Sequence, residues 1–157
     1  MSEQQKIFMH EAIRLAMENV KSGGGPFGAV VVKDGVIIGK GANSVTIDND
    51  PSAHAEVNAI RDACKNLNSF QLSGCEIYSS CEPCPMCLGA IYWARPEKIF
   101  FGSSKKDAAD AGFDDSFIYK EIDLPCESRK IKAVQLLKDE AAEVFQLWRS
   151  TEDKIEY

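Results

Sequence analysis

Residues 75–87 of the chain read CEIYSSCEPCPMC, in which an apolar, β-prone run leads into a pair of closely spaced cysteines. The run over 75–80 predicts a strand. A helix is predicted from 84 to about 94. Cys84 and Cys87 therefore lie at i and i+3 where this helix begins, so both sulfur atoms can face one point. The positive end of the helix dipole also favours thiolates, the form of cysteine that binds metals.

A His-Ala-Glu stretch at 54–56 lies upstream, near the start of another predicted helix over 51–67. Strand-to-helix connections of an open α/β sheet meet at one rim, where ligands bind. A catalytic zinc needs three protein ligands and an open fourth position for water. His54, Cys84 and Cys87 supply that number. We therefore predict one Zn²⁺ per chain, with a water or hydroxide as its fourth ligand.

Other interpretations of the cysteines stay open. Cys81 and Cys84 also form a CxxC pair, although Pro83 separates them and Cys81 belongs to the end of the strand. A lone CxxC would also fit a redox dithiol or cysteines buried as small apolar side chains. A structural zinc module without activity would want Cys81 as a fourth protein ligand. The remaining cysteines are expected to be structural: Cys64, Cys75 and Cys126.

Helix and strand patterns alternate along the rest of the chain, which indicates a single α/β domain over 1–157 with a partly parallel sheet covered by helices. Asp34-Gly35 between two apolar runs predicts a hairpin. After Gly102 the pattern weakens, and so long a stretch is either functional or exchanged between subunits. In chain order, the sequence predicts a helix over 5–20, strands over 28–33 and 36–41, a helix over 51–67 capped by Asp50 or Ser52, a strand over 75–80, a helix from 84 to about 94, strands over 97–101 and 131–137, and a helix near 139–151.

Composition narrows the classes of partner. The chain has 157 residues, of which 45% are hydrophobic and 27% charged, as is ordinary for a globular domain. A net charge of −6 disfavours a large phosphate-binding surface, so we expect no nucleic-acid partner. No apolar run approaches the roughly 18 residues of a membrane span, and the start MSEQQKIFMHEA lacks an export-signal pattern. We therefore expect no membrane partner and a cytoplasmic location, where cysteines stay reduced.

H-x-E followed by P-C-x-x-C resembles the signature of zinc-dependent nucleobase deaminases. Most of the chain from residue 24 resembles small bacterial guanine deaminases of the cytidine-deaminase-like type, in the stretches GGPFGAVVVKDG, NDPSAHAEVNAIR, SCEPCPMCLGAIYWARP, DAADAGFDDSFIYKEI and KIEY. This resemblance implies a three-layer α/β/α fold around a central mixed sheet. It also implies a hydrolase of purine catabolism or salvage that converts guanine, its small-molecule partner, to xanthine and ammonia.

The signature also implies a role for Glu56 other than metal ligation. In such enzymes zinc generates hydroxide from water at neutral pH, and the hydroxide attacks an amidine-type ring carbon. Glu56 would carry the proton of the water to a ring nitrogen and then to the departing amine. The alternative for Glu56 is a carboxylate that is simply stabilised at a helix start by the helix dipole.

Pocket candidates rest on chemistry together with the resemblance. Phe27 can lie flat on a purine ring or be a core residue, and Asn43 can donate to and accept from a purine edge or belong to a turn. Guanine presents N1–H and a 2-amino group, both donors. The resemblance points to Asp115 as the catalytic carboxylate that accepts them, with Asp114 as its neighbour. The remaining substrate-binding candidates are Ala55 and Trp93, of which Trp93 is equally typical of a core.

The resemblance reaches the last residue, Tyr157, and implies a homodimer whose C-terminal segments exchange and close the partner's active site. The stretch around 102–130 would supply the connector. Tyr157 is therefore expected to cover the bound purine, most simply in the neighbouring subunit. Besides the structural zinc module, two other functions stay open. One is a guanosine or other nucleoside deaminase, and the other is a tRNA adenosine deaminase, which needs a basic approach to a flipped-out base.

Overall fold

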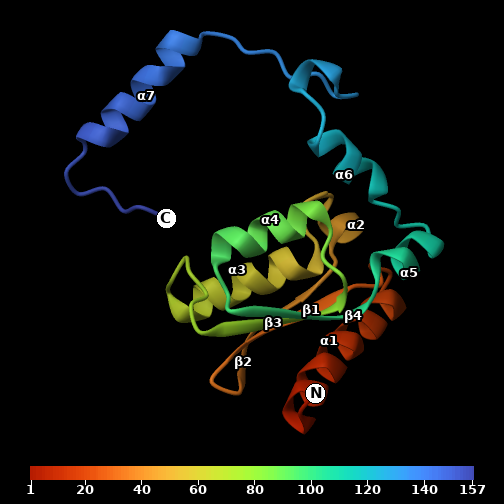
Figure 1. The fold of residues 1–157 in the computed structure, drawn as a ribbon. Coiled ribbons are helices and arrows are strands. Elements are labelled where there is room, and N and C mark those ends of the chain that lie inside the picture. The colour runs from red at the N-terminus through yellow and green to blue at the C-terminus, as the bar shows by residue number, and fades with distance from the viewer. The chain divides into compact units, whose positions relative to one another are not determined.

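The computed structural model describes residues 1–157, which separate into two compact units, Met1–Asp115 and Ser116–Tyr157. The first unit contains a four-stranded sheet and five helices, and the second unit is helical (Figure 1). None of the helices combines the length and the apolar character needed to cross a membrane. The elements of the first unit are α1 (Glu3–Lys21), β1 (Gly28–Lys33), β2 (Val36–Ala42), α2 (Val45–Asp48), α3 (Ala55–Leu67), β3 (Cys75–Cys81), α4 (Pro85–Ala94), β4 (Lys98–Ser103) and α5 (Lys105–Asp110).

The sheet is mixed and has the order β2-β1-β3-β4. β1 is antiparallel to both of its neighbours, whereas β3 and β4 are parallel. The turn between β1 and β2 has positive φ angles at both central residues, 50° at Asp34 and 76° at Gly35. This is the backbone that a two-residue hairpin turn requires, so the predicted hairpin is confirmed.

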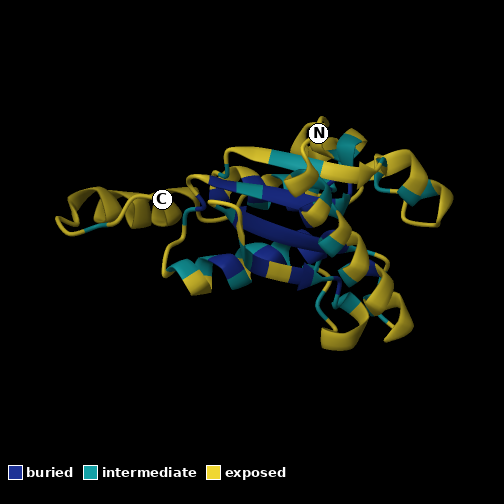
Figure 2. Cartoon of the chain, turned by 90° about the horizontal axis from the view of Figure 1, so that it is seen from below, coloured by how far each residue is buried: buried dark blue, intermediate teal, exposed yellow.

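Helices cover both faces of the sheet: α1 lies on one face, and α3 with α4 lies on the other (Figure 1). Alternate side chains of β1 and β3 point to opposite faces. Ala29 and Ile77 pack in the core beneath α3 and α4, whereas Val30 and Tyr78 pack with Phe8 of α1. The two inner strands, β1 and β3, form the buried centre of this unit (Figure 2). The predicted three-layer α/β/α arrangement with a central mixed sheet is confirmed.

Glycines set how closely α3 approaches the sheet. A methyl group at Gly41 of β2 would overlap the backbone of Ala55 and Ala59, and one at Gly39 would press against Ala59 and Ala63. These alanines recur every four residues and form a fully buried stripe along α3. Small residues on both sides therefore let the backbones of β2 and α3 meet, and this contact fixes the start of α3.

The second unit contains α6 (Ser116–Ile122), a short 3₁₀ helix (Cys126–Ser128) and α7 (Lys138–Ser150). None of its residues is buried (Figure 2). The Nε of Arg129 donates to the carbonyl oxygen of Leu124, and the Lys130 amide donates to Glu121 Oε2 at 2.7 Å. These bonds hold the turn between α6 and the segment that leads to α7. The predicted helix near 139–151 is confirmed as α7.

The secondary structure differs from the prediction in three places. The helix predicted over 51–67 begins only at Ala55, because Asp50 accepts hydrogen bonds from Ser52 in a turn and does not cap a helix. Residues 131–137 form no strand, since no neighbouring strand pairs with them in this chain. The weakly patterned stretch after Gly102 contains α5 and α6, two helices that the sequence did not predict.

Candidate active site

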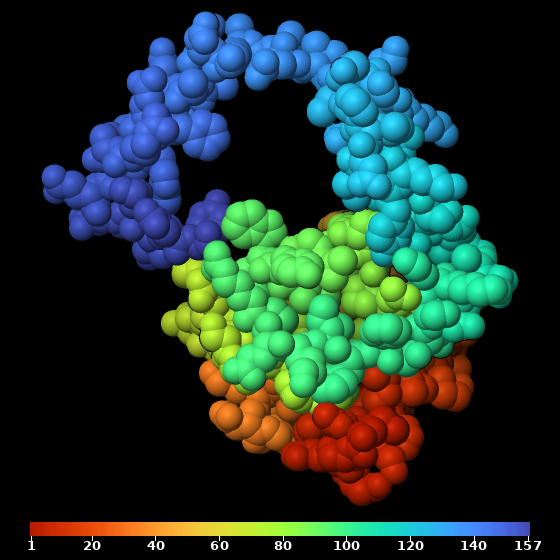
Figure 3. All heavy atoms as spheres, viewed as in Figure 1, coloured from red at the N-terminus to blue at the C-terminus, as the bar shows by residue number.

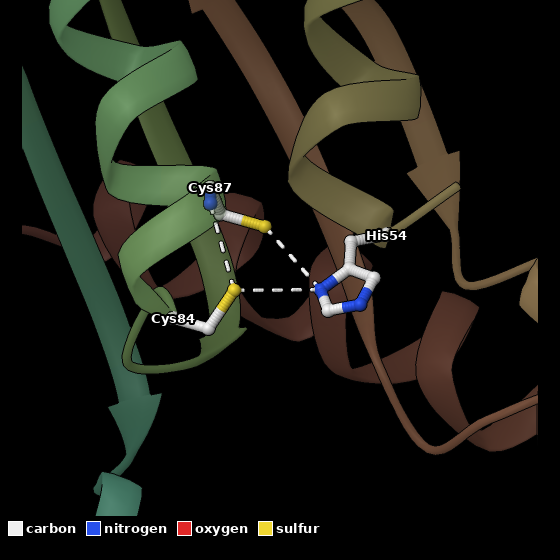
Figure 4. A group of neighbouring side chains, drawn as sticks. All are labelled: His54, Cys84 and Cys87. Atoms are coloured by element: carbon white, nitrogen blue, oxygen red, sulfur yellow. Dashed lines mark hydrogen bonds between the residues drawn. The ribbon is translucent and has the colours of Figure 1, made fainter. Parts of the chain in front are cut away.

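The starts of two helices bring the three predicted metal ligands together. His54 is the N-cap residue of α3, and its ring makes no capping hydrogen bond. Cys84 is the N-cap residue of α4, and Cys87 lies in the first turn of that helix. The Nδ1 atom of His54 lies 3.5 Å from Sγ of Cys84 and 3.5 Å from Sγ of Cys87 (Figure 4). The three donor atoms all lie within 4.8 Å of one another.

This donor set fits a tetrahedral zinc ion. Zinc binds histidine nitrogen at about 2.0 Å and thiolate sulfur at about 2.3 Å, which at tetrahedral angles separates nitrogen from sulfur by about 3.5 Å. The nitrogen–sulfur separations from His54 to the two cysteines are 3.5 Å. Three protein ligands of this kind leave a fourth position for water, as in catalytic zinc sites.

The two thiols share their protons unequally. The pKa of Cys84 is lowered to about 4, because its sulfur accepts hydrogen bonds from the thiol of Cys87 and from His54. The pKa of Cys87 is raised, by the same bond to Cys84 and by burial. The bond to Cys84 also raises the pKa of His54. The low pKa of Cys84 favours the thiolate, the form of cysteine that binds metals, and a bound dication would also displace the proton of Cys87.

Glu56 lies beside this cluster, in the first turn of α3, with only 5% of its surface exposed. Burial raises the pKa of its carboxyl group, against the effect of hydrogen bonds that include one from Ser79. The Oγ atom of Ser79 donates to Oε1 of Glu56 at 3.0 Å. A carboxyl group with a raised pKa holds a proton more readily than an exposed one, which suits a group that takes up and gives back a proton during a reaction.

Cys81 lies outside the donor cluster. Its Sγ atom contacts the carbonyl oxygen of Ser104 at 3.7 Å. Burial raises the pKa of the Cys81 thiol to about 11, so it stays protonated at neutral pH. The geometry therefore favours the pair Cys84 and Cys87 over a pair that contains Cys81.

The pocket candidates differ in their surroundings. Phe27 is half-buried and meets Phe113 edge to face, with ring centroids 5.0 Å apart. Asn43 is buried at the end of β2, where its Oδ1 atom accepts from the Val45 amide at 3.3 Å. The side chain of Ala55 is fully buried in the core.

Trp93 is not a core residue, because it lies on α4 and is 64% exposed. Figure 3 shows α4, in green, at the surface of the first unit. Asp115 is partly buried, whereas Asp114 is exposed. Burial and the charge of Cys84 raise the pKa of Asp115, which places its carboxylate within electrostatic reach of the donor cluster. Tyr157 belongs to the second unit and is 71% exposed.

Two features of the first unit were not predicted from the sequence. One is the hydrogen bond that Ser79 donates to Glu56. Ser79 belongs to no motif in the sequence, so nothing there predicts this bond. The other is a pocket of about 430 Å³ whose lining includes Ile13 and Met17 of α1 and Ala108 of α5. None of the three metal donors lines this pocket, so it is distinct from the zinc site.

Comparisons with known proteins place the chain among deaminases. Residues 2–103 match the family described as the cytidine and deoxycytidylate deaminase zinc-binding region. The guanine deaminase of Bacillus subtilis (strain 168) is 60% identical over 151 residues, which cover 96% of this chain and 97% of that protein. The tRNA-specific adenosine deaminase of Aquifex aeolicus (strain VF5) is 38% identical over 141 residues, which cover 90% of this chain and 91% of the relative.

Solved structures agree with these matches. The X-ray structure of guanine deaminase from Bacillus subtilis has a TM-score of 0.95 and 57% identity, and the match covers 100% of this chain and 99% of that one. A structure of guanine deaminase from Nitrosomonas europaea has a TM-score of 0.69 and 27% identity, and the match covers 96% of this chain and 86% of that one. The fold is therefore the cytidine-deaminase-like α/β fold.

Proposed function

We propose that this chain, which belongs to the cytidine and deoxycytidylate deaminase zinc-binding family, hydrolyses guanine to xanthine and ammonia. The observation that carries the proposal is the 60% identity to a guanine deaminase over almost the whole chain. The cluster of His54, Cys84 and Cys87 beside the buried Glu56 supplies the chemistry that this reaction needs. Water provides the new carbonyl oxygen of xanthine, and the amino group of guanine leaves as ammonia.

The cofactor is zinc, and His54, Cys84 and Cys87 would hold it. When bound, zinc lowers the pKa of a coordinated water from about 16 towards 7 and so supplies a nucleophile at neutral pH. Glu56 takes up one proton of the attacking water and passes it to the ring nitrogen next to the attacked carbon. It then takes up the remaining proton of that oxygen, as the new carbonyl forms, and delivers it to the departing amine. Its burial suits this role, because solvent cannot compete for the proton.

Asp115 is proposed to distinguish guanine from other bases. Guanine presents donors at N1 and at the 2-amino group, and a carboxylate can accept from both. The electrostatic influence of Cys84 on Asp115 supports a position at the substrate. We further propose that Asn43 contacts the purine edge and that Phe27 packs against the ring, with Ala55, Asp114 and Trp93 as the remaining candidates for the pocket.

A side-by-side assay of guanine, guanosine, adenine and cytosine tests this function. Xanthine formation and ammonia release should be fast with guanine and much slower with the other three. Rapid turnover of guanosine with little turnover of guanine would make the chain a nucleoside deaminase. An inert guanine sample, together with deamination of adenosine in a tRNA loop, would replace the proposal with the editing reaction of its adenosine-deaminase relatives. A chain that binds zinc but deaminates none of them would be a structural module.

We also propose that the chain forms a homodimer in which the second unit docks on a second copy. No residue of this unit is buried in the single chain. α7 exposes Val144, Phe145 and Leu147, and Ile131 and Val134 of the extended segment before it are also exposed. So much exposed apolar surface is typical of an interface. The six cysteines, all free thiols, would suit a cytoplasmic location for this dimer.

The first unit offers surfaces that complement these residues. β4 is an edge strand of the sheet, and an unpaired strand edge is a template for an added segment. Next to it, the pocket of about 430 Å³ is lined mainly by apolar residues, which include Ile13, Met17 and Val20 of α1. We propose that residues 131–137 of one copy lie along β4 of the other and that α7 packs over this pocket. Tyr157 would then cover the purine in the partner's site.

Light scattering on Phe145→Lys tests the docking surface, because a lysine within an apolar interface should yield monomers. Gln146→Lys is the matched control. It adds the same side chain at the next position, which lies on the opposite side of α7 from Val144. A Phe145→Lys variant that stays dimeric, or a parent chain that is monomeric and fully active, would contradict the proposed exchange.

Complementation tests which subunit Tyr157 serves. A variant that lacks residues 154–157 and a Glu56→Gln variant should each be nearly inactive. In a mixed dimer, the intact tail of the Glu56→Gln chain can close the intact site of the truncated chain. Random mixing after subunit exchange should therefore restore about a quarter of the parent activity. No recovery would mean that each tail closes its own site, and full activity of the truncated chain alone would mean that the tail has no role.

A further inference from the structure

Ser79 stands out because it is a fully buried polar residue on an otherwise apolar face. Across residues 1–157, the buried polar or charged residues are Asn43, Glu56 and Ser79. Ile77 lies two positions before Ser79 on the same face of β3, and Ala29 of β1 is the residue paired with Ser79. Both are fully buried and apolar. A buried polar side chain among apolar ones calls for a specific reason.

The partner of Ser79 is the catalytic carboxyl group. Its Oγ atom lies 3.0 Å from Oε1 of Glu56. A carboxylate can only accept, so the serine hydroxyl donates in this pair. Ser79 and Glu56 are 1% and 5% exposed, so water cannot replace the bond. β3 is a central strand, paired on both sides, and it therefore holds this donor rigidly.

We infer that Ser79 is a positioning residue for the deamination: by donating to Oε1, it fixes the orientation of the Glu56 carboxyl group and leaves Oε2 to carry the proton. The bond persists whichever form Glu56 takes, because Oε1 can accept in both. Without it, the carboxyl group can rotate, and its proton-carrying oxygen loses a fixed direction toward the substrate. This inference rests on the proposed function of Glu56 as the proton carrier.

Ser79→Ala tests this role. With guanine as substrate, kcat should fall roughly ten- to hundredfold, the scale of one hydrogen bond to a charged group, with KM changed less than about threefold. Zinc content should equal that of the parent, since Ser79 is no metal donor. Ser79→Thr keeps a hydroxyl on the strand and should recover most of the lost kcat. A Ser79→Ala enzyme with parental kcat, or a Ser79→Thr enzyme as slow as Ser79→Ala, would overturn the inference.

Tyr78→Phe is the matched control. It removes a buried hydroxyl from the adjacent position of β3, where Tyr78 donates to Glu76 at 2.6 Å on the opposite face of the sheet. This hydroxyl–carboxylate pair is remote from the reaction, so kcat should stay within about threefold of the parent value. An equal fall of kcat in Tyr78→Phe and Ser79→Ala would show that any lost hydroxyl in β3 slows the enzyme, and it would contradict a specific role.

A double-mutant comparison separates positioning from a general effect on folding. If Ser79 acts through Glu56, then Ser79→Ala should cause little further loss of kcat in a Glu56→Gln background. Equal losses in both backgrounds would assign Ser79 a role independent of Glu56 and overturn the inference. A parent chain that does not deaminate guanine would instead contradict the proposed function, and a fully active Glu56→Gln variant would contradict the role of Glu56 itself.

Discussion

Replacing Gly41 by alanine should disturb the zinc site through the packing of α3 on the sheet. A methyl group at this position of β2 would overlap the carbonyl oxygen of Ala55 and the amide nitrogen of Ala59. Both are backbone atoms of α3, so no flexible side chain can swing aside. Because an ordinary carbon contact needs about 3.5 Å, α3 has to move away from β2 by roughly 1 Å.

That displacement separates the two halves of the site. His54 and Glu56 belong to the start of α3, whereas Cys84 and Cys87 belong to the start of α4. Misplacement of a reacting group by about 1 Å can cost on the order of 10²-fold in rate, so guanine turnover should fall by about that factor. Overpacking costs about 1–3 kcal/mol, which in a protein of this size lowers Tm by roughly 2–10 °C.

Three measurements on Gly41→Ala check this reasoning: guanine turnover, zinc content after dialysis, and Tm from calorimetry. Gly28→Ala is the control, because its methyl group would overlap the backbone of Ala12 and Ala16 in α1, a helix that carries no metal donor. It should lower Tm by a similar amount and retain zinc. Parental turnover and Tm in Gly41→Ala would refute the argument, as would equal zinc loss in the two variants.

Further substitutions test the individual roles. Cys84→Ser or Cys87→Ser should abolish tight zinc binding and Cys81→Ser should preserve it, and metal analysis with the opposite pattern would exchange the ligands. Glu56→Gln should fold and keep its zinc but lose roughly 10²-fold or more in turnover, so a near-normal rate would remove its role as proton carrier. Asp115→Asn should slow guanine deamination, because the amide offers a donor where guanine also presents donors. Unchanged guanine kinetics in that variant would exclude the contact.

The metal donors were predictable because local chemistry fixes them. Cys84 and Cys87 lie three residues apart at the start of a helix, which brings their sulfur atoms to one side. The predicted start of α3 was wrong because an aspartate accepts hydrogen bonds from backbone amides two or three residues ahead both in a turn and at a helix N-cap. Here Asp50 accepts from the Ser52 amide in a turn. Ser104 did carry a usable signal for α5, since its side chain and that of Asp107 form a capping box.

Ser79 lay beyond sequence reasoning for a different reason. Its importance depends on the first turn of α3 bringing Glu56 within reach of β3, and only the packing of the helix on the sheet determines that placement. The small residues that permit this approach are Gly39 and Gly41, and in the sequence they look like ordinary interruptions of a strand. Motifs thus locate the groups that contact metal, whereas tertiary packing decides which groups hold the proton carrier.

In the C-terminal segment, the sequence pattern predicts a helix correctly and a strand wrongly. The apolar pattern of α7 predicts its helix, because the 3.6-residue period is a property of the segment itself. The pattern over 131–137 predicts a strand and fails, because a strand exists only when another strand accepts its hydrogen bonds. Ile131, Val134 and Leu136 are all exposed within the second unit, which has no buried residue of its own. The apolar pattern of a segment predicts that one of its faces is buried, and it does not predict which molecule buries that face. Under the proposed exchange, the covering surface is the β4 edge of a second copy, so the error at 131–137 and the exposure of α7 have one physical cause.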